Sequence, residues 1–138
     1  AIGNGFIHGF GLVRGAIGST VAHDAHNLIA VGVTHEAIAR VANHLRENGG
    51  GIAAFDPATD AYTTLELPVA GLVSDEPLDR VKAQFQAVER SARDLGFSHP
   101  GGVSELTFLA LEVVPEIRLT NNGLVDVRAN DYVDVVIE

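Results

Sequence analysis

The sequence predicts an α+β fold, with mixed α/β content in a single compact domain. Two stretches, at about 35–48 and 76–95, carry apolar residues at the spacing of an amphipathic helix. Several short runs rich in apolar and β-branched residues are separated by turn-forming residues, which indicates about five to eight strands in one or more sheets. The elements come in groups, with strands first, then a helix, then a hairpin, and this grouping is typical of α+β domains.

The chain begins with predicted strands. Residues 6–13 and 16–22 fit two strands, and the Arg-Gly pair between them fits a tight turn. Residues 28–33 form a continuous apolar run that is short enough for a buried strand. The polar segment 23–27 therefore lies between two predicted strands.

The first helix and a hairpin follow. Thr34 can cap this helix, which is predicted to end near Asn48 before a run of three glycines. Gly49, the first of the three, is expected to adopt the left-handed conformation that commonly ends a helix. Residues 52–55 and 62–67 predict the two strands of a hairpin, because turn-forming residues connect them.

The second helix has the clearest periodicity in the chain. It is predicted to begin near Ser74 or Asp75, with Pro77 in its first turn, where a missing N–H costs little. Gly96 is predicted to end it.

The last part of the sequence is less regular. Residues 106–114 form an apolar run that fits either a strand or a buried helix. Residues 121–123 predict a turn, and residues 132–137 predict a final strand.

Composition excludes several classes of protein. The chain has 138 residues, 46% of them hydrophobic, which suffices for one domain, 1–138, with its own core. Its 9 basic and 18 acidic residues give a formal net charge of −9, so neither nucleic acid nor an anionic membrane is an expected partner. The absence of cysteine excludes disulfides, thiolate zinc sites and a cysteine nucleophile. No apolar run reaches the roughly 18 residues of a membrane span and no signal peptide is visible, so a cytoplasmic location is expected.

The polar segment 23–27 is the main candidate for a functional site. It contains His23, Asp24, His26 and Asn27, whose side chains can hold a metal, orient a water or bind the edge of a heterocycle. The two histidines would share one face of a helix but would point to opposite faces of a strand, so spacing alone does not define a metal site. The alternative interpretation is a turn at a strand end, in which the polar side chains bond to nearby backbone.

The other histidines are less promising. His8 lies in a predicted apolar strand, and His99 precedes a proline in a predicted loop. His35 and His44 lie on the first helix but off its apolar stripe, and they are expected to be solvated. The glycine-rich stretches lack the strand–glycine–helix order that a phosphate-binding loop requires.

The polar segment also carries a family resemblance. Residues 9–27, GFGLVRGAIGSTVAHDAHN, resemble the C-terminal domain of adenine deaminases, which are members of the amidohydrolase superfamily. In the same order follow residues 49–53 (GGGIA), 67–77 (LPVAGLVSDEP) and the closing region from LTFLAL to NGLVDV. The resemblance covers nearly the whole chain, with one departure at Ala25, where the family pattern leads us to expect serine.

The resemblance implies a part of a purine-metabolism enzyme. Adenine deaminases hydrolyse adenine to hypoxanthine and ammonia at a divalent metal (Mn, Fe or Zn) held in an amidohydrolase barrel. A barrel takes about 250 residues, so none is encoded here. The implied partners are thus the barrel domain, in the same or a separate chain, and adenine as substrate of the whole enzyme. No cofactor is expected in this domain, and the isolated domain is expected to be inactive.

The resemblance also implies a role for the polar segment. Facing the barrel mouth, His23, Asp24, His26 and Asn27 would support catalysis, with His23 and Asn27 as candidate substrate contacts. The only candidate metal ligands in this chain are His23, Asp24 and His26, and no metal is expected there. Two alternatives stay open: a non-catalytic module for small-ligand binding or homo-oligomerisation without a barrel, and a small independent metal-dependent hydrolase.

Overall fold

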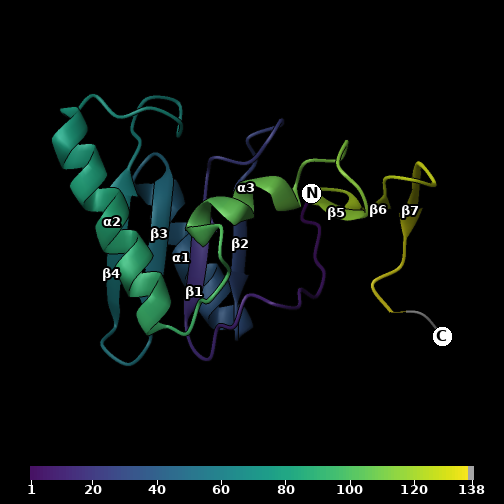
Figure 1. Cartoon of the computed structure of the whole chain (residues 1–138), viewed down its shortest axis with the longest axis horizontal. Coiled ribbons are helices and arrows are strands. Elements are labelled where there is room, and N and C mark those ends of the chain that lie inside the picture. Colours follow the sequence, from purple (N-terminus) through teal and green to yellow (C-terminus); the bar gives the residue numbers. More distant parts are fainter. Residues whose placement is uncertain (137–138) are drawn as a thin grey trace.

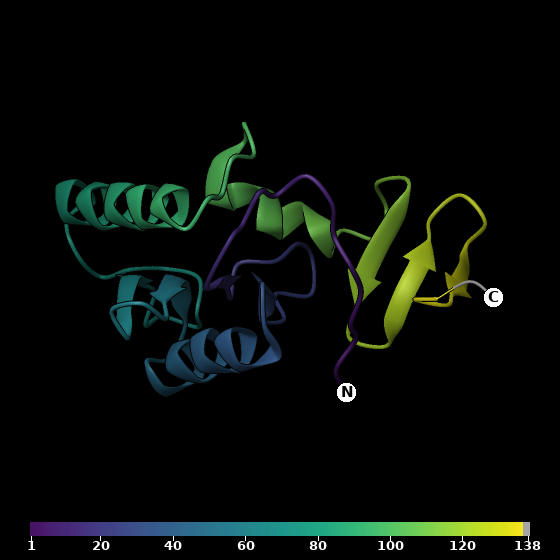
Figure 2. The ribbon, with the colours of Figure 1, turned by 90° about the horizontal axis from the view of Figure 1, so that it is seen from below.

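The computed structural model describes residues 1–136 as a layered α+β domain, as predicted. A four-stranded antiparallel sheet is covered by one helix on one face and by further helices on the other (Figures 1 and 2). Its strands follow the spatial order β2-β1-β3-β4. They are β1 (Ala16–Ser19), β2 (Ile29–Gly32), β3 (Gly51–Asp56) and β4 (Ala61–Glu66). No helix in this described part of the chain is long and apolar enough to cross a membrane.

The sheet buries both of its faces because consecutive residues of its central strands, β1 and β3, are apolar or small and nearly all are buried. Ile17 and Ala54 are register partners, and their side chains belong to the core beneath α2 (Leu78–Asp94). Ala16 and Phe55, one position away on the same two strands, belong to the core beneath α1 (His35–Glu47). The period of two along the strands thus divides the interior into two apolar layers.

The helix α1 begins and ends where the sequence predicts. The Thr34 side chain accepts a hydrogen bond from the Ala37 N–H at 3.1 Å, which caps the first turn. At the other end Gly49 has φ +77°, the left-handed conformation expected there. The β3–β4 hairpin that follows is also confirmed.

The helix α2 starts later than Ser74 or Asp75. Its N-cap residue is Pro77, which has an extended ψ of 147° and supplies no capping side chain. The Ser74 hydroxyl instead accepts a hydrogen bond from the Glu76 N–H at 3.3 Å in the loop before the helix. The helix therefore begins at Leu78, immediately after the proline.

The predicted strand at residues 6–13 is wrong. This segment has no regular secondary structure, and of its side chains only that of Phe10 is buried. Gly9 and Gly11 have positive φ values of 92° and 77°, so the backbone cannot continue as an extended strand. Composition favoured a strand, but no neighbouring strand is in place to pair with it.

The C-terminal part forms short helices and a second sheet. The ambiguous run 106–114 is neither a strand nor a long helix, because only the single turn α3 (Leu106–Leu109) is helical, after the 3₁₀ helix η1 (Gly102–Glu105). Three antiparallel strands then form a small sheet at one end of the molecule (Figure 1). They are β5 (Ile117–Thr120), β6 (Gly123–Asp126) and β7 (Asp131–Val133).

Two sequence predictions concern this second sheet. The predicted turn at residues 121–123 is confirmed, since it connects β5 to β6. The predicted final strand at 132–137 is shorter than expected, because β7 ends at Val133, and position 137 lies outside the described residues.

Candidate functional site

The polar segment 23–27 forms a loop at one edge of the four-stranded sheet, between the end of β1 and the start of β2. His23 is half-buried, whereas Asp24, His26 and Asn27 are exposed. The His23 N–H donates to the carbonyl oxygen of Thr107 at 3.2 Å, and the His26 N–H donates to the carbonyl oxygen of Ala22 at 2.7 Å. The loop is therefore fixed both within itself and to α3.

Three aromatic rings gather on this loop. The His23 and His26 ring centroids lie 5.6 Å apart with their planes at 62°, and the Phe108 ring centroid lies 5.9 Å from that of His23. The Phe108 side chain is 45% exposed although it comes from an apolar run. Sequence analysis missed Phe108, because that run could be assigned neither to a strand nor to a helix.

The loop does not form a metal site by itself. The closest approach between His23 Nδ1 and Asp24 Oδ1 is 3.9 Å. Within residues 1–136, no three or more His, Cys, Asp or Glu side chains are grouped so that they could hold a metal ion. Structural and catalytic metal sites in proteins use at least three such ligands, so the described residues do not fit the divalent metal that the resemblance implies.

The base of the polar segment is tied together by Thr20. Its Oγ1 donates to the carbonyl oxygen of Gly71 at 2.6 Å and accepts a hydrogen bond from the Gly51 N–H at 2.8 Å. A Cβ at Gly50 would lie 2.4 Å from the Cα of Gly71, so these backbones touch. We call this contact of Thr20, Gly50, Gly51 and Gly71 the glycine junction.

The glycine junction gives a structural reason for the glycines in the motifs that carry the family resemblance. The segments 9–27, 49–53 and 67–77 are far apart in the sequence, yet they meet at one point, three residues before His23. Sequence analysis did not single out Thr20. The available signal was the occurrence of glycines in both of the later motifs, which indicates a close backbone approach.

His44 is not solvated as predicted. Its ring stacks on that of Tyr62, with centroids 4.0 Å apart and planes at 4°, and its Nε2 lies 2.8 Å from Thr64 Oγ1. Arg40 lies over the Phe55 ring at 4.6 Å and donates to the Tyr62 hydroxyl at 2.9 Å. The hydrogen bond to Tyr62 contributes most to raising the Arg40 pKa. These groups join α1 to β4 and lie apart from the polar segment.

The remaining histidines lie outside the candidate site. His8 and His35 are exposed. The His99 ring centroid lies 5.5 Å from that of Phe10, and Phe10 belongs to the core layer that α2 covers. Of the six histidines, only His23 and His26 lie in the polar segment.

The fold and the site together define an α+β domain that presents histidines and a phenylalanine at one sheet edge. Residues 1–131 match the family model described as the adenine deaminase C-terminal domain. The chain is 41% identical over 137 residues to an adenine deaminase of Methanosphaera stadtmanae, covering 99% of this chain and 25% of the relative. The match to that of Archaeoglobus fulgidus is 42% over 134 residues, covering 97% and 24%. The match to that of Moorella thermoacetica is 43% over 136 residues, covering 99% and 23%.

These matches establish the family. The chain belongs to the adenine deaminase C-terminal domain family. It spans about a quarter of the length of the curated relatives that it matches.

Proposed function

We propose that this chain acts as the C-terminal domain of an adenine deaminase and that its polar segment helps to close the purine pocket. The observation that carries this proposal is the anchored loop. The glycine junction and the Thr107 carbonyl hold His23 and His26 at a sheet edge, where His26 and Phe108 are exposed. Polar side chains held rigidly at a surface are suited to binding, whereas a turn with only a structural role needs no exposed aromatic neighbours.

The side chains fit the recognition of a flat, polar heterocycle. Adenine hydrolysis breaks the bond from the ring carbon to the exocyclic amino group and forms a carbon–oxygen bond, which gives hypoxanthine and ammonia. The Asn27 amide both donates and accepts hydrogen bonds, as does a neutral imidazole at His23 or His26. The Phe108 ring supplies an apolar surface of the kind that lines pockets for planar ligands.

The rest of the active site lies outside this domain in the proposal. We assign the divalent metal to an amidohydrolase barrel in the same or a separate chain, because the described residues offer no ligand set for it. The domain comprises residues 1–138, works in the cytoplasm and is inactive alone. Its direct roles are to pack on the barrel and to contribute His23, Asp24, His26 and Asn27 to the closed pocket.

The test compares histidine variants in a full-length adenine deaminase that carries this domain. We expect His23→Ala and His26→Ala to lower kcat/KM for adenine by about 100-fold, the lower end of what a positioned acid or base contributes. The bound metal per enzyme should stay constant, because the metal is held elsewhere. His35→Ala is the matched control, since His35 is an exposed histidine at the start of α1. Unchanged turnover in both variants would refute the proposal.

A second candidate function rests on a different observation. Large apolar side chains are exposed along residues 1–13 and around the second sheet, which favours a binding or oligomerisation module without a barrel. Size-exclusion chromatography of the 138-residue chain distinguishes the two, because this module would self-associate without any other protein.

A further inference from the structure

The second sheet has no core of its own. Within the described range 108–136, no residue is buried. Leu119, Leu124 and Val133 are register partners across β5, β6 and β7, so they form an apolar row on one face. A small sheet is stable only when such a face packs on something. Figures 1 and 2 show that this sheet projects from one end of the molecule, with the two long helices lying away from it.

The start of the chain crosses this apolar face. A Cβ at Gly5 would lie 2.9 Å from Leu124 Cδ2, and a Cβ at Gly3 would lie 1.9 Å from the carbonyl oxygen of Thr120. Glycine lets the backbone approach closely, but it brings no side chain to cover Leu124. Among the described residues, Leu119, Leu124 and Val133 are therefore only partly covered.

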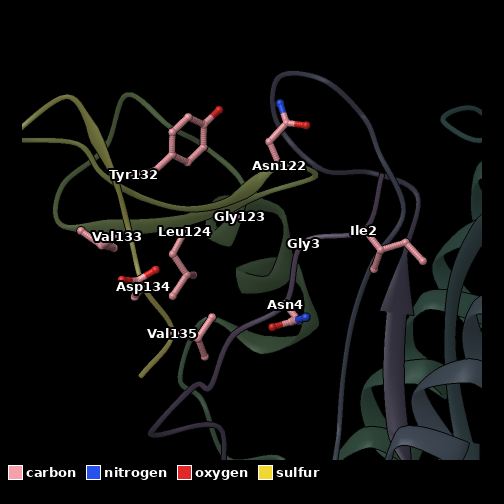
Figure 3. Close-up of a pocket in the computed structure, with 10 residues that line it drawn as sticks. All are labelled: Ile2, Gly3, Asn4, Asn122, Gly123, Leu124, Tyr132, Val133, Asp134 and Val135. Atoms are coloured by element: carbon pink, nitrogen blue, oxygen red, sulfur yellow. The ribbon is translucent and has the colours of Figure 1, made fainter. Parts of the chain in front are cut away.

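A cleft remains beside this crossing segment. It has a volume of about 360 Å³ and lies between residues 2–4 and the strands β6 and β7 (Figure 3). Its lining is mixed: it includes the apolar residues Ile2, Leu124, Val133 and Val135 and the polar residues Asn4, Asn122, Tyr132 and Asp134.

The segments that form this end of the molecule also carry exposed apolar side chains. Phe6 is 89% exposed and Ile2 is 93% exposed. Several exposed large apolar side chains at one end of a molecule are typical of an interaction surface. We call the exposed large apolar residues at this end of the molecule the apolar end. It consists of Ile2, Phe6, Ile7, Ile117 and Val136.

We propose that the apolar end is the docking surface for the polypeptide that precedes this domain in full-length adenine deaminases. In the relatives, the matched C-terminal domain is about a quarter of the protein, so most of the polypeptide lies outside it. That polypeptide would join this domain at Ala1, which lies beside β5 at the apolar end (Figure 1). Direct covalent connection gives it a high effective concentration there.

The charges nearby define the chemistry of the docking partner. Between positions 112 and 134 there are five carboxylates and two arginines. One of these arginines, Arg128, forms an ion pair with Glu116 at 3.0 Å. The complementary surface therefore has an apolar centre and a rim of Lys or Arg opposite Asp131 and Asp134. This inference depends on one part of the proposed function, namely that the chain works as part of a longer adenine deaminase.

The test uses a full-length adenine deaminase that carries this domain, with a specific protease site inserted before Ala1. After cleavage, size-exclusion chromatography at serial dilution measures whether the domain stays bound to the rest of the enzyme. We expect the wild-type domain to stay bound. Phe6→Ser combined with Ile117→Ser should raise the dissociation constant at least about tenfold, and Ile2→Ser, at an exposed residue that lines the cleft, is a second variant of the same surface.

Leu78→Ser is the matched control. Leu78 is 82% exposed at the start of α2, at the other end of the molecule, and its replacement should leave the dissociation constant unchanged (Figure 1). Circular dichroism of each released domain verifies that the variants are folded.

Each remaining outcome is decisive. The proposal is overturned if the wild-type domain separates on cleavage, if the folded variants bind as tightly as wild type, or if the released domain pairs with a second copy instead. Turnover of the uncleaved His23→Ala enzyme is measured separately. A failure of docking is therefore distinguishable from a failure of the proposed role of the polar segment.

Discussion

The hydroxyl of Thr20 joins two segments that are 51 residues apart, because it donates to the carbonyl oxygen of Gly71 at 2.6 Å. The same oxygen accepts a hydrogen bond from the Gly51 N–H at 2.8 Å. One side chain thus satisfies two backbone groups at the sheet edge from which the polar segment begins.

Replacing Thr20 by valine should destabilise the domain. Valine has nearly the same shape but leaves the Gly51 N–H and the Gly71 carbonyl without their partner, at a cost of about 1–3 kcal/mol. Thr20→Ser keeps the hydroxyl and should lose much less. Urea unfolding of the 138-residue chain measures both. Equal stability of the valine and serine variants would show that the hydroxyl contributes nothing.

Two neighbouring glycines should respond differently to alanine. Gly50 has φ +115°, and a Cβ there would lie 2.4 Å from the Cα of Gly71, so Gly50→Ala forces backbone atoms apart. Gly49 has φ +77° but nothing within 4 Å of an added Cβ, so Gly49→Ala should cost only about 1–2 kcal/mol of conformational strain. Thermal unfolding should give a clearly lower Tm for Gly50→Ala than for Gly49→Ala, and the reverse order would contradict the close contact.

Glu89 should be needed for its hydrogen bond to η1 rather than for its charge. Its Oε1 accepts a hydrogen bond from the Val103 N–H at 2.8 Å, and its side chain is only 15% exposed. Glu89→Ala leaves that N–H unpaired and should cost about 1–3 kcal/mol. Glu89→Gln retains an acceptor oxygen and is the control. If chemical denaturation finds the two variants equally stable, the hydrogen bond has no net effect.

The stability of the domain should fall in acid partly through Asp56. Two hydrogen bonds from the Arg14 guanidinium, at 3.1 and 3.0 Å, hold the pKa of the Asp56 carboxyl below its ordinary value, with help from the Ala58 N–H. A carboxyl whose pKa is lower in the folded than in the unfolded state stabilises the folded domain. This stabilisation is fully present at pH values above the unfolded pKa of about 3.9. That contribution disappears as the pH falls through the folded value.

The measurement is the free energy of unfolding as a function of pH. Asp56→Asn should flatten its slope below about pH 5, because the variant has no carboxyl to protonate. Asp75→Asn removes an exposed carboxylate from the loop before α2 and should keep the wild-type slope. An unchanged slope for Asp56→Asn would exclude this linkage.

Sequence reasoning succeeded where local patterns decide the structure. The first helix has its apolar stripe, its Thr34 cap and its terminal glycine within one short stretch, so its bounds were predicted correctly. The β3–β4 hairpin was predicted for the same reason, since its turn is local. The family resemblance was predicted from short motifs and is confirmed over residues 1–131.

The failures concern features that depend on distant parts of the chain. Residues 6–13 have the composition of a strand, but a strand requires a pairing partner, which composition does not reveal. His44 looked solvated because its helix position is off the apolar stripe, yet Tyr62 on β4 covers it. The location of the polar segment was predicted, but its contacts with Phe108 and Thr107 depend on residues more than 80 positions away. Its proposed catalytic role stays a prediction.

The glycine junction also constrains the order of folding. The contacts of Thr20 span 31 and 51 residues, so closing them requires large loops and brings an entropic cost before any stabilisation is gained. The β3–β4 hairpin can form by itself, whereas the bond to Gly71 requires both β1 and the loop after β4 to be in place. Any partial opening of the domain that detaches Gly71 also removes a support of the polar segment, residues 23–27.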